Sequence, residues 1–171
     1  MAEGEVLARG PVATGVDVAA VFAASYRRLV VQLYGVTGNA GEAEDLVQEA
    51  FVRAYAAGAR FRRVDNPEAW LRVTAINLHR TRWRKMRNFA RIKDRITGPP
   101  DLPGLEEHWE VVDALRRLPE NLRVVLVLHY LADRQVHQIA EELGVAEGTV
   151  KSRLSRGRDA LAAELGQEER S

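Results

Sequence analysis

The residues from Lys151 to Arg156 combine positive charge and hydroxyl groups at the spacing of one helix face. At about 100° of rotation per residue, Ser152, Ser155 and Arg156 point outward together, with Lys151 and Arg153 on their flanks. The opposite stripe consists of apolar or small residues: Val150, Leu154, Gly157 and Leu161. The outward side chains can donate hydrogen bonds to phosphates and to base edges in the major groove of DNA. This pattern is typical of a DNA-reading helix.

A shorter amphipathic segment comes directly before this basic helix. Its apolar residues follow the i, i+3, i+4, i+7 spacing of one helix face: Val136, Ile139, Ala140 and Leu143. Gly144 then stands where a helix C-cap takes a left-handed backbone conformation. Two short helices around a glycine turn, the second with a basic outer face, favour a helix-turn-helix over Gln135–Leu161. The alternative is an ordinary αα-hairpin with a solvated basic face.

Charge is strongly segregated along the chain, although the net charge is only +1. Residues 57–95 contain 12 Lys or Arg against 3 Asp or Glu, and the sequence on either side is net acidic. In a helix predicted over Pro67–Arg87, Trp83 stands among five cations: Arg80, Arg82, Arg84, Lys85 and Arg87. Cations interleaved with an aromatic ring suit phosphate contact and base stacking. The block predicts a polyanionic partner such as nucleic acid, and the alternative is a helix that packs on an acidic neighbour.

A helix predicted over Gly41–Ala57 places two carboxylates one turn apart. Asp45 and Glu49, with Gln48 beside them, share an outward edge of this helix. Spacing alone favours a solvated acidic face. Paired carboxylates can also act in acid–base catalysis, but that role needs a cleft and a perturbed pKa, and the surrounding sequence indicates neither.

Several kinds of chemistry are not predicted. The chain has no cysteine, which excludes disulfides and thiolate metal sites. Its four histidines lack the spacing of a metal motif, and its glycines form no phosphate loop. We therefore expect a protein that is not an enzyme and holds no metal or cofactor. No stretch approaches the roughly 18 apolar residues of a membrane helix, and no signal peptide is recognisable, so a cytoplasmic location without membrane insertion is expected.

The apolar residues follow helix periods, and no segment alternates as a strand does, so the sequence predicts an all-α protein. Three prolines and two glycines fall within the eight residues Thr97–Gly104, which is typical of a linker. We predict two small helical domains joined by this Pro/Gly linker. The expected order is a flexible tail at residues 1–16, a domain at 17–95, a linker at 96–105, a domain at 106–166 and a tail at 167–171.

Four segments, in this order and spacing, resemble an extracytoplasmic-function (ECF) sigma factor of bacterial RNA polymerase. They are DLVQEAFVRAY at Asp45–Tyr55, NPEAWLRVTAIN with the basic helix after it at Asn66–Lys85, LRRLPENLRVVLVLHYL at Leu115–Leu131, and IAEELGVAEGTVKSRLSRGRDAL at Ile139–Leu161. The resemblance covers nearly the whole chain. It implies two helical domains, called regions two and four, that bind core polymerase, recognise a promoter and direct transcription initiation.

Region two corresponds to the first predicted domain. The resemblance implies that four of its residues dock on the clamp helices of the polymerase beta-prime subunit: Asp45, Gln48, Glu49 and Phe51. This replaces the interpretation as a solvated acidic face. The minus-ten element would bind as single-stranded DNA, with a base flipped toward Asn77 and toward Phe61 of the loop Arg60–Asp65. Three cations would hold the DNA backbone there: Arg80, Arg84 and Lys85.

Region four corresponds to the second predicted domain. Its helix-turn-helix would read the minus-thirty-five element through Lys151, Ser152, Arg153, Ser155 and Arg156. The beta flap of the polymerase and an anti-sigma factor are further implied partners. The sequence departs from the family pattern at Gln135 and Gln138, where a Ser or Thr N-cap and an acidic residue are usual, and at Thr74, where an aliphatic residue is common. Weaker capping predicts a less sharply started first helix of the motif.

Two other functions are compatible with parts of the sequence. A free-standing helix-turn-helix regulator would bind duplex operators as a dimer, without polymerase. An adaptor would use its helices to bind protein alone, but the basic block around Trp83 argues against this possibility.

Overall fold

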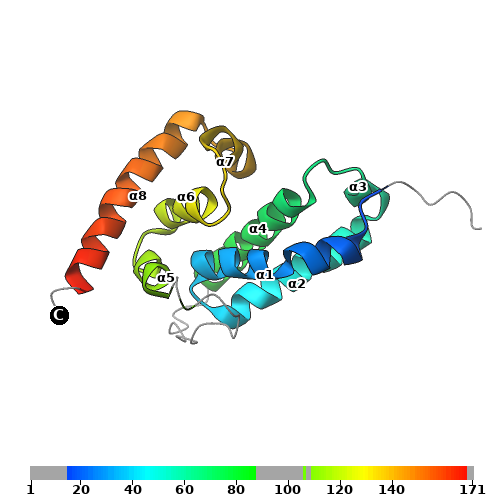
Figure 1. Ribbon diagram of the computed structural model, residues 1–171, viewed down its shortest axis with the longest axis horizontal. Coiled ribbons are helices and arrows are strands. Elements are labelled where there is room, and N and C mark those ends of the chain that lie inside the picture. Colours follow the sequence, from blue (N-terminus) through cyan, green and yellow to red (C-terminus); the bar gives the residue numbers. More distant parts are fainter. Residues whose placement is uncertain (1–14, 88–105, 107–108, 169–171) are drawn as a thin grey trace, which may run out of the picture.

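The computed structural model describes residues 15–87, 106 and 109–168. The predicted linker, and residues 1–14 and 169–171 of the predicted tails, lie outside the described residues. Within the described part the elements are all helices, which confirms the predicted all-α class. Figure 1 shows them in chain order: α1 Val18–Thr37, α2 Ala40–Ala57, α3 Ala59–Arg62, α4 Pro67–Arg87, α5 Trp109–Arg116, α6 Glu120–Tyr130, α7 Val136–Leu143 and α8 Glu147–Glu168.

The first group of helices is formed by α1, α2 and α4, which pack on one another, and the short α3. Side-chain caps set the starts of the two later long helices. The Oδ1 atom of Asn39 accepts a hydrogen bond from the N–H of Glu42 at 2.9 Å, and that of Asn66 accepts one from the N–H of Ala69 at 3.0 Å. The apolar faces meet in a core that includes Leu29, Leu33, Leu46, Val47, Phe61 and Leu71. Local capping and apolar periodicity thus position α2 and α4, the helices that bear the predicted region two contacts.

The second group of helices, α5 to α8, is built around α6. Residues 124–128 are all buried, because α1, α7 and α8 each pack against this helix. Gly157 allows α8 to approach closely, since a Cβ atom there would lie 3.0 Å from Cδ1 of Leu126. Gly144 has a φ of 65° and ends α7 in the left-handed conformation, as the sequence predicts. The pair α7 and α8 therefore has the arrangement of the predicted helix-turn-helix.

The start of α7 is better supported than its N-cap residue suggests. The backbone N–H of Gln135 donates to Oε1 of Gln138 at 3.0 Å. A side chain that reaches back from the third helical residue to the N-cap satisfies one of the backbone groups left open at a helix start. The Gln138 side chain, which itself departs from the family pattern, therefore partly offsets the weak capping expected from Gln135.

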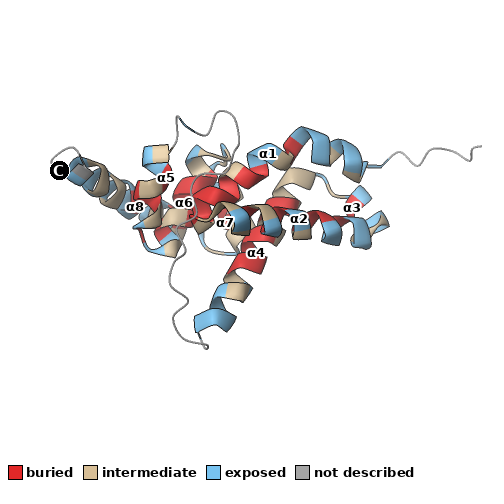
Figure 2. Cartoon of the chain, turned by 90° about the horizontal axis from the view of Figure 1, so that it is seen from below, coloured by how far each residue is buried: buried red, intermediate tan, exposed pale blue. Residues whose placement is uncertain are grey.

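The two groups of helices pack directly on each other through α1, α5 and α6. A Cβ atom on Gly35 would lie 3.0 Å from Cγ2 of Val127 and 3.1 Å from Cδ1 of Leu131, so the glycine permits close contact between α1 and α6. Tyr34 is fully buried and stacks on Trp109 with ring centroids 6.2 Å apart, and burial raises the pKa of its phenol. One apolar core therefore runs through both groups, as the buried ribbon of α1 and α6 in Figure 2 shows. The domain boundaries stay a prediction.

Candidate nucleic-acid interface

The outward face of α8 carries the residues predicted to contact the minus-thirty-five element. Four of them are exposed and Arg153 is half-buried; the exposed ones are Lys151, Ser152, Ser155 and Arg156. Val150 and Leu154 on the other side are buried, with 0% and 3% of their surface exposed. The packing of this apolar stripe fixes the rotation of α8 about its axis. Its basic, hydroxyl-bearing face consequently points away from the core.

The C-terminal half of α4 forms a second cationic surface. Asn77, Arg84 and Lys85 are exposed, and Trp83 has 47% of its surface exposed. The guanidinium of Arg87 lies 5.2 Å from the centroid of the Trp83 ring, a cation–π distance. Figure 2 shows this end of α4 projecting from the body of the molecule. The structure therefore brings an amide, cations and an indole together on one projecting helix end, which can bind phosphates and stack on bases.

Two cations in the basic half of α4 already have acidic partners. Nε of Arg80 lies 3.5 Å from Oε1 of Glu120 in α6, and Arg82 forms an ion pair with Glu49 of α2. Glu49 also binds Arg53 one turn along α2, at 3.1 Å. The alternative of a basic helix that packs on acidic neighbours is therefore correct for Arg80 and Arg82.

Phe61 does not lie where the predicted base contact requires. It is fully buried in the core and meets Trp70 edge-on with ring centroids 5.1 Å apart. A ring without exposed surface has no face on which a base could stack. The structure corrects the expected role of Phe61 to support of the segment Arg60–Asp65 from the inside. The start of this predicted loop belongs to the short helix α3, and Arg60 and Asp65 are exposed.

The four residues predicted to dock on the polymerase lie along α2, but their surroundings differ. Asp45 and Gln48 are exposed, and Nε2 of Gln48 donates to the hydroxyl of Tyr26 at 3.3 Å. Phe51 is 6% exposed and meets Phe22 edge-on, with ring centroids 4.9 Å apart. Glu49, as described above, is held by two arginines. The acidic edge is therefore backed by an aromatic cluster that joins α2 to α1.

Two exposed aromatic residues beside that cluster are not predicted from the sequence. Phe22 and Tyr55 have 43% and 80% of their surface exposed, and both line an open groove of about 620 Å³ near the start of α1. The signal was present as i, i+4 aromatic pairs, Phe22 with Tyr26 and Phe51 with Tyr55. Such pairs share a helix face, but spacing cannot tell an exposed face from a buried one.

Other kinds of site are not found in the part of the chain that the structure describes. There, no three acidic or histidine side chains are grouped as a metal ion would need. His79 is buried, and its Nδ1 lies 2.8 Å from Oε1 of Glu42, so its contact is a polar pair between α4 and α2. No described helix has the length and apolar character to cross a membrane.

Comparison with known proteins agrees with this geometry. The family model for sigma-70 region 2 matches residues 21–89, and the model for sigma-70 region 4 matches residues 108–161. The first match contains α2 and α4, and the second contains the helix-turn-helix.

The relatives found are sigma factors, a class of proteins that are not enzymes. ECF RNA polymerase sigma factor SigW of Bacillus subtilis is 32% identical over 158 residues, which span 82% of this chain and 84% of that protein. ECF RNA polymerase sigma factor SigL of Mycobacterium tuberculosis is 34% identical over 127 residues, 70% of this chain and 72% of that protein. The sigma factor RpoE of Bartonella quintana, solved in complex with the anti-sigma factor NepR, superposes with a TM-score of 0.70 at 26% identity, covering 87% of this chain and 94% of that one. With both family models matched and these relatives covered over most of their length, the chain belongs to the extracytoplasmic-function sigma factors of bacterial RNA polymerase, which recognise promoters and direct transcription initiation.

Proposed function

We propose that this sigma factor reads a bipartite promoter with two separate surfaces and delivers RNA polymerase to it. It would act in the cytoplasm, without a cofactor and without catalysing a reaction itself. The observation that carries the proposal is the presence of two exposed cationic surfaces on different helices, the end of α4 and the outer face of α8. A protein that binds only a duplex operator through its helix-turn-helix does not need the exposed cationic surface at the end of α4.

The end of α4 would bind the minus-ten element as a single strand. Asn77 offers an exposed amide that can hydrogen-bond the edge of a flipped base, and Arg84 and Lys85 would hold the neighbouring phosphates. Trp83 adds a stacking surface, and base–aromatic stacking contributes about 1–3 kcal/mol per base. Flipping a base costs a few kcal/mol, which these contacts can offset. Arg80 would join them once it leaves Glu120.

The outer face of α8 would read the minus-thirty-five element as a duplex. Its two arginines, Arg153 and Arg156, can each bind a guanine through two hydrogen bonds, which contributes about 1–3 kcal/mol of discrimination between bases. Lys151, Ser152 and Ser155 would contact phosphates or base edges beside them.

Core polymerase would bind along α2. Asp45 and Gln48 present an exposed polar edge to the basic clamp helices of the beta-prime subunit, with Phe51 packed beneath it. Glu49 would exchange Arg82 for a clamp cation, and that exchange would release Arg82 toward the DNA. We further propose contact of the second group of helices with the beta flap, and control by an anti-sigma factor.

The direct test is transcription by the purified chain with bacterial core polymerase. Mapping transcript starts should show specific promoters that core polymerase alone does not use. Asn77→Ala should lower this transcription by about tenfold or more, the equivalent of one lost base contact. Arg28→Met, at an exposed residue of α1 outside both cationic surfaces, is the control and should retain wild-type activity. The absence of a complex with core polymerase on a sizing column would overturn the proposal.

A free-standing operator-binding regulator is the second candidate, because the α8 face is exposed in the chain alone. It predicts tight binding to a palindromic duplex without polymerase, and loss of Asn77 should then have no effect. Duplex binding that is weak until polymerase is added would exclude this candidate.

A further inference from the structure

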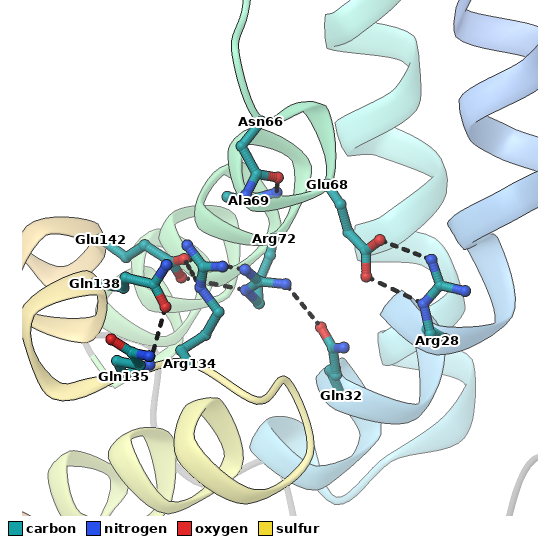
Figure 3. A network of polar contacts seen from close by, with 10 residues as sticks. All are labelled: Arg28, Gln32, Asn66, Glu68, Ala69, Arg72, Arg134, Gln135, Gln138 and Glu142. Carbon is teal, nitrogen blue, oxygen red and sulfur yellow. Dashed lines mark hydrogen bonds and ion pairs between the residues drawn. The ribbon is translucent and has the colours of Figure 1, made fainter.

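A buried ionic cluster joins the two groups of helices. Arg72 of α4 donates from Nη2 to Oε1 of Glu142 in α7 at 3.0 Å and from Nε to Oε2 at 3.2 Å. Nε of Arg134 donates to the same Oε1 at 2.6 Å, and Nη1 of Arg72 donates to Oε1 of Gln32 in α1 at 3.3 Å. Figure 3 shows the four side chains converging between α1, α4 and α7.

Burial makes this cluster energetically different from the other ion pairs. The side chains of Arg72 and Glu142 are 3% and 8% exposed, whereas those of Arg28 and Glu68 nearby are 60% and 28% exposed. An exposed pair contributes little, but removal of one partner of a buried pair leaves an uncompensated charge in a medium of low dielectric constant. Glu142 is paired on both oxygens, and Arg72 comes from the group that does not contain Glu142 or Arg134. The relative position of the two groups is therefore stabilised by a buried ion pair, and loss of one of its charges is strongly destabilising.

Close packing at two glycines stabilises the same contact between the two groups of helices. We call this packed state the closed arrangement. Gly35 admits Val127 and Leu131 against α1, as described above. At the end of α1, a Cβ atom on Gly38 would lie 2.7 Å or less from three side-chain atoms of Arg116 in α5. Both glycines therefore allow contacts that any larger residue would hinder. The closed arrangement also occupies Arg80, a predicted DNA contact, with Glu120.

The closed arrangement is too small to read both promoter elements at once. Elements named for positions minus ten and minus thirty-five are about 25 base pairs apart, or about 85 Å along straight B-form DNA. A compact chain of this length has a radius of gyration of about 15 Å. The two groups must therefore separate before α4 and α8 can each reach an element.

We propose that the Arg72–Glu142–Arg134 cluster is an ionic lock that holds the free sigma factor closed, and that binding to polymerase and promoter must open it. This inference rests on the proposed function for the need to open, but the closed state itself can be measured without polymerase. The lock lowers the apparent affinity for polymerase, because only the open fraction of the free chain is competent to bind.

The test measures the distance between the two groups in the full chain by energy transfer. The chain has no cysteine, so Ala24→Cys in α1 and Ala163→Cys in α8, both exposed, supply two unique dye sites. Arg72→Met removes the contact between the groups and leaves Glu142 paired with Arg134. Gly35→Leu is a second, steric disruption that does not touch the cluster and favours helix in α1. Arg28→Met is the matched control, because it breaks an exposed pair within the first group.

The free wild-type protein and Arg28→Met should show one short-distance population. Arg72→Met and Gly35→Leu should show a long-distance population at least severalfold larger, and bind core polymerase correspondingly more tightly. Circular dichroism checks that each variant keeps its helices. If Arg72→Met does not fold, the distance distribution of Gly35→Leu shows whether loss of the contact between the groups opens the chain. Equal distance distributions in the wild type and in folded disrupted variants would overturn the lock.

The outcomes separate the lock from the proposed function. Promoter-specific transcription together with unchanged distances in the disrupted variants would refute the lock and leave the function intact. Opened variants without any promoter-specific transcription, in the presence of core polymerase, would support the lock and refute the function.

Discussion

At the scale of single residues, burial decides which side chains can act. The resemblance assigns both Phe61 and Asn77 to the minus-ten contact, but only Asn77 is exposed. Glu49 and Arg82 neutralise each other across α2 and α4, so each has a structural role before any partner arrives. Residue type and motif position are therefore insufficient to assign a contact, since the same residue can serve the core.

Phe61→Ala is expected to destabilise the protein rather than to remove a DNA contact. Truncation of a fully buried phenylalanine costs about 3–5 kcal/mol of unfolding free energy, because it removes buried apolar surface and leaves a cavity beside Trp70. Urea unfolding followed by circular dichroism measures this cost. Tyr55→Ala, at an 80% exposed aromatic residue, should change stability by less than about 0.5 kcal/mol. Wild-type stability of Phe61→Ala combined with weakened promoter binding would restore the base-contact role.

At the scale of elements, caps and apolar stripes place each helix. The start of α7 illustrates how a poor residue can be compensated locally. Gln135 is not a preferred N-cap residue, but the Gln138 side chain satisfies its backbone N–H at 3.0 Å. The first helix of the helix-turn-helix therefore starts where the apolar pattern indicates.

Replacement of Gln135 by a strong N-cap residue should stabilise the protein. We expect Gln135→Ser to raise the unfolding free energy by about 0.5–1 kcal/mol, because the serine hydroxyl can accept a hydrogen bond from an N–H of the first turn of α7. Urea unfolding at constant pH gives the measurement. Gln135→Ala has no side-chain acceptor and serves as the control, for which no gain is expected. A stability of Gln135→Ser at or below that of Gln135→Ala would show that capping does not limit this helix.

At the scale of the whole molecule, charge distribution and closure are the two properties that matter. The net charge of +1 conceals a basic block in residues 57–95 between acidic flanks. Long-range attraction to DNA therefore depends on which face of the protein points toward the DNA. In the closed arrangement, part of the basic block forms ion pairs with acidic residues of the same chain. The pairs formed between the two groups are Arg80 with Glu120 and Arg72 with Glu142.

Promoter binding by the polymerase complex should weaken steeply with salt, and single cations should account for separate parts of that slope. If Lys151 contacts a phosphate, Lys151→Ala should reduce the slope of log affinity against log salt by about 1 and weaken binding similarly on different promoters. Filter binding at several salt concentrations measures the slope. Arg28→Ala removes the same charge from α1, far from α8, and should leave the slope unchanged. An equal change in both variants would indicate a general charge effect without a local contact.

The local sequence is sufficient to predict features that depend on neighbouring residues. Helix periods, the left-handed turn at Gly144 and the outward basic face of α8 are all local properties. The four-segment resemblance adds the family, because order and spacing are also properties of the linear chain.

Features that depend on residues far apart in the chain emerge only when the helices pack together. Arg72 and Glu142 are 70 positions apart, and nothing local marks either as half of a buried pair. The burial of Phe61, the pairing of Arg82 with Glu49 and the close packing at Gly35 are likewise set by helices that meet only after folding. Apolar periodicity predicts which face of a helix is buried, but not which other helix packs on that face. The closed arrangement depends on these packing partners.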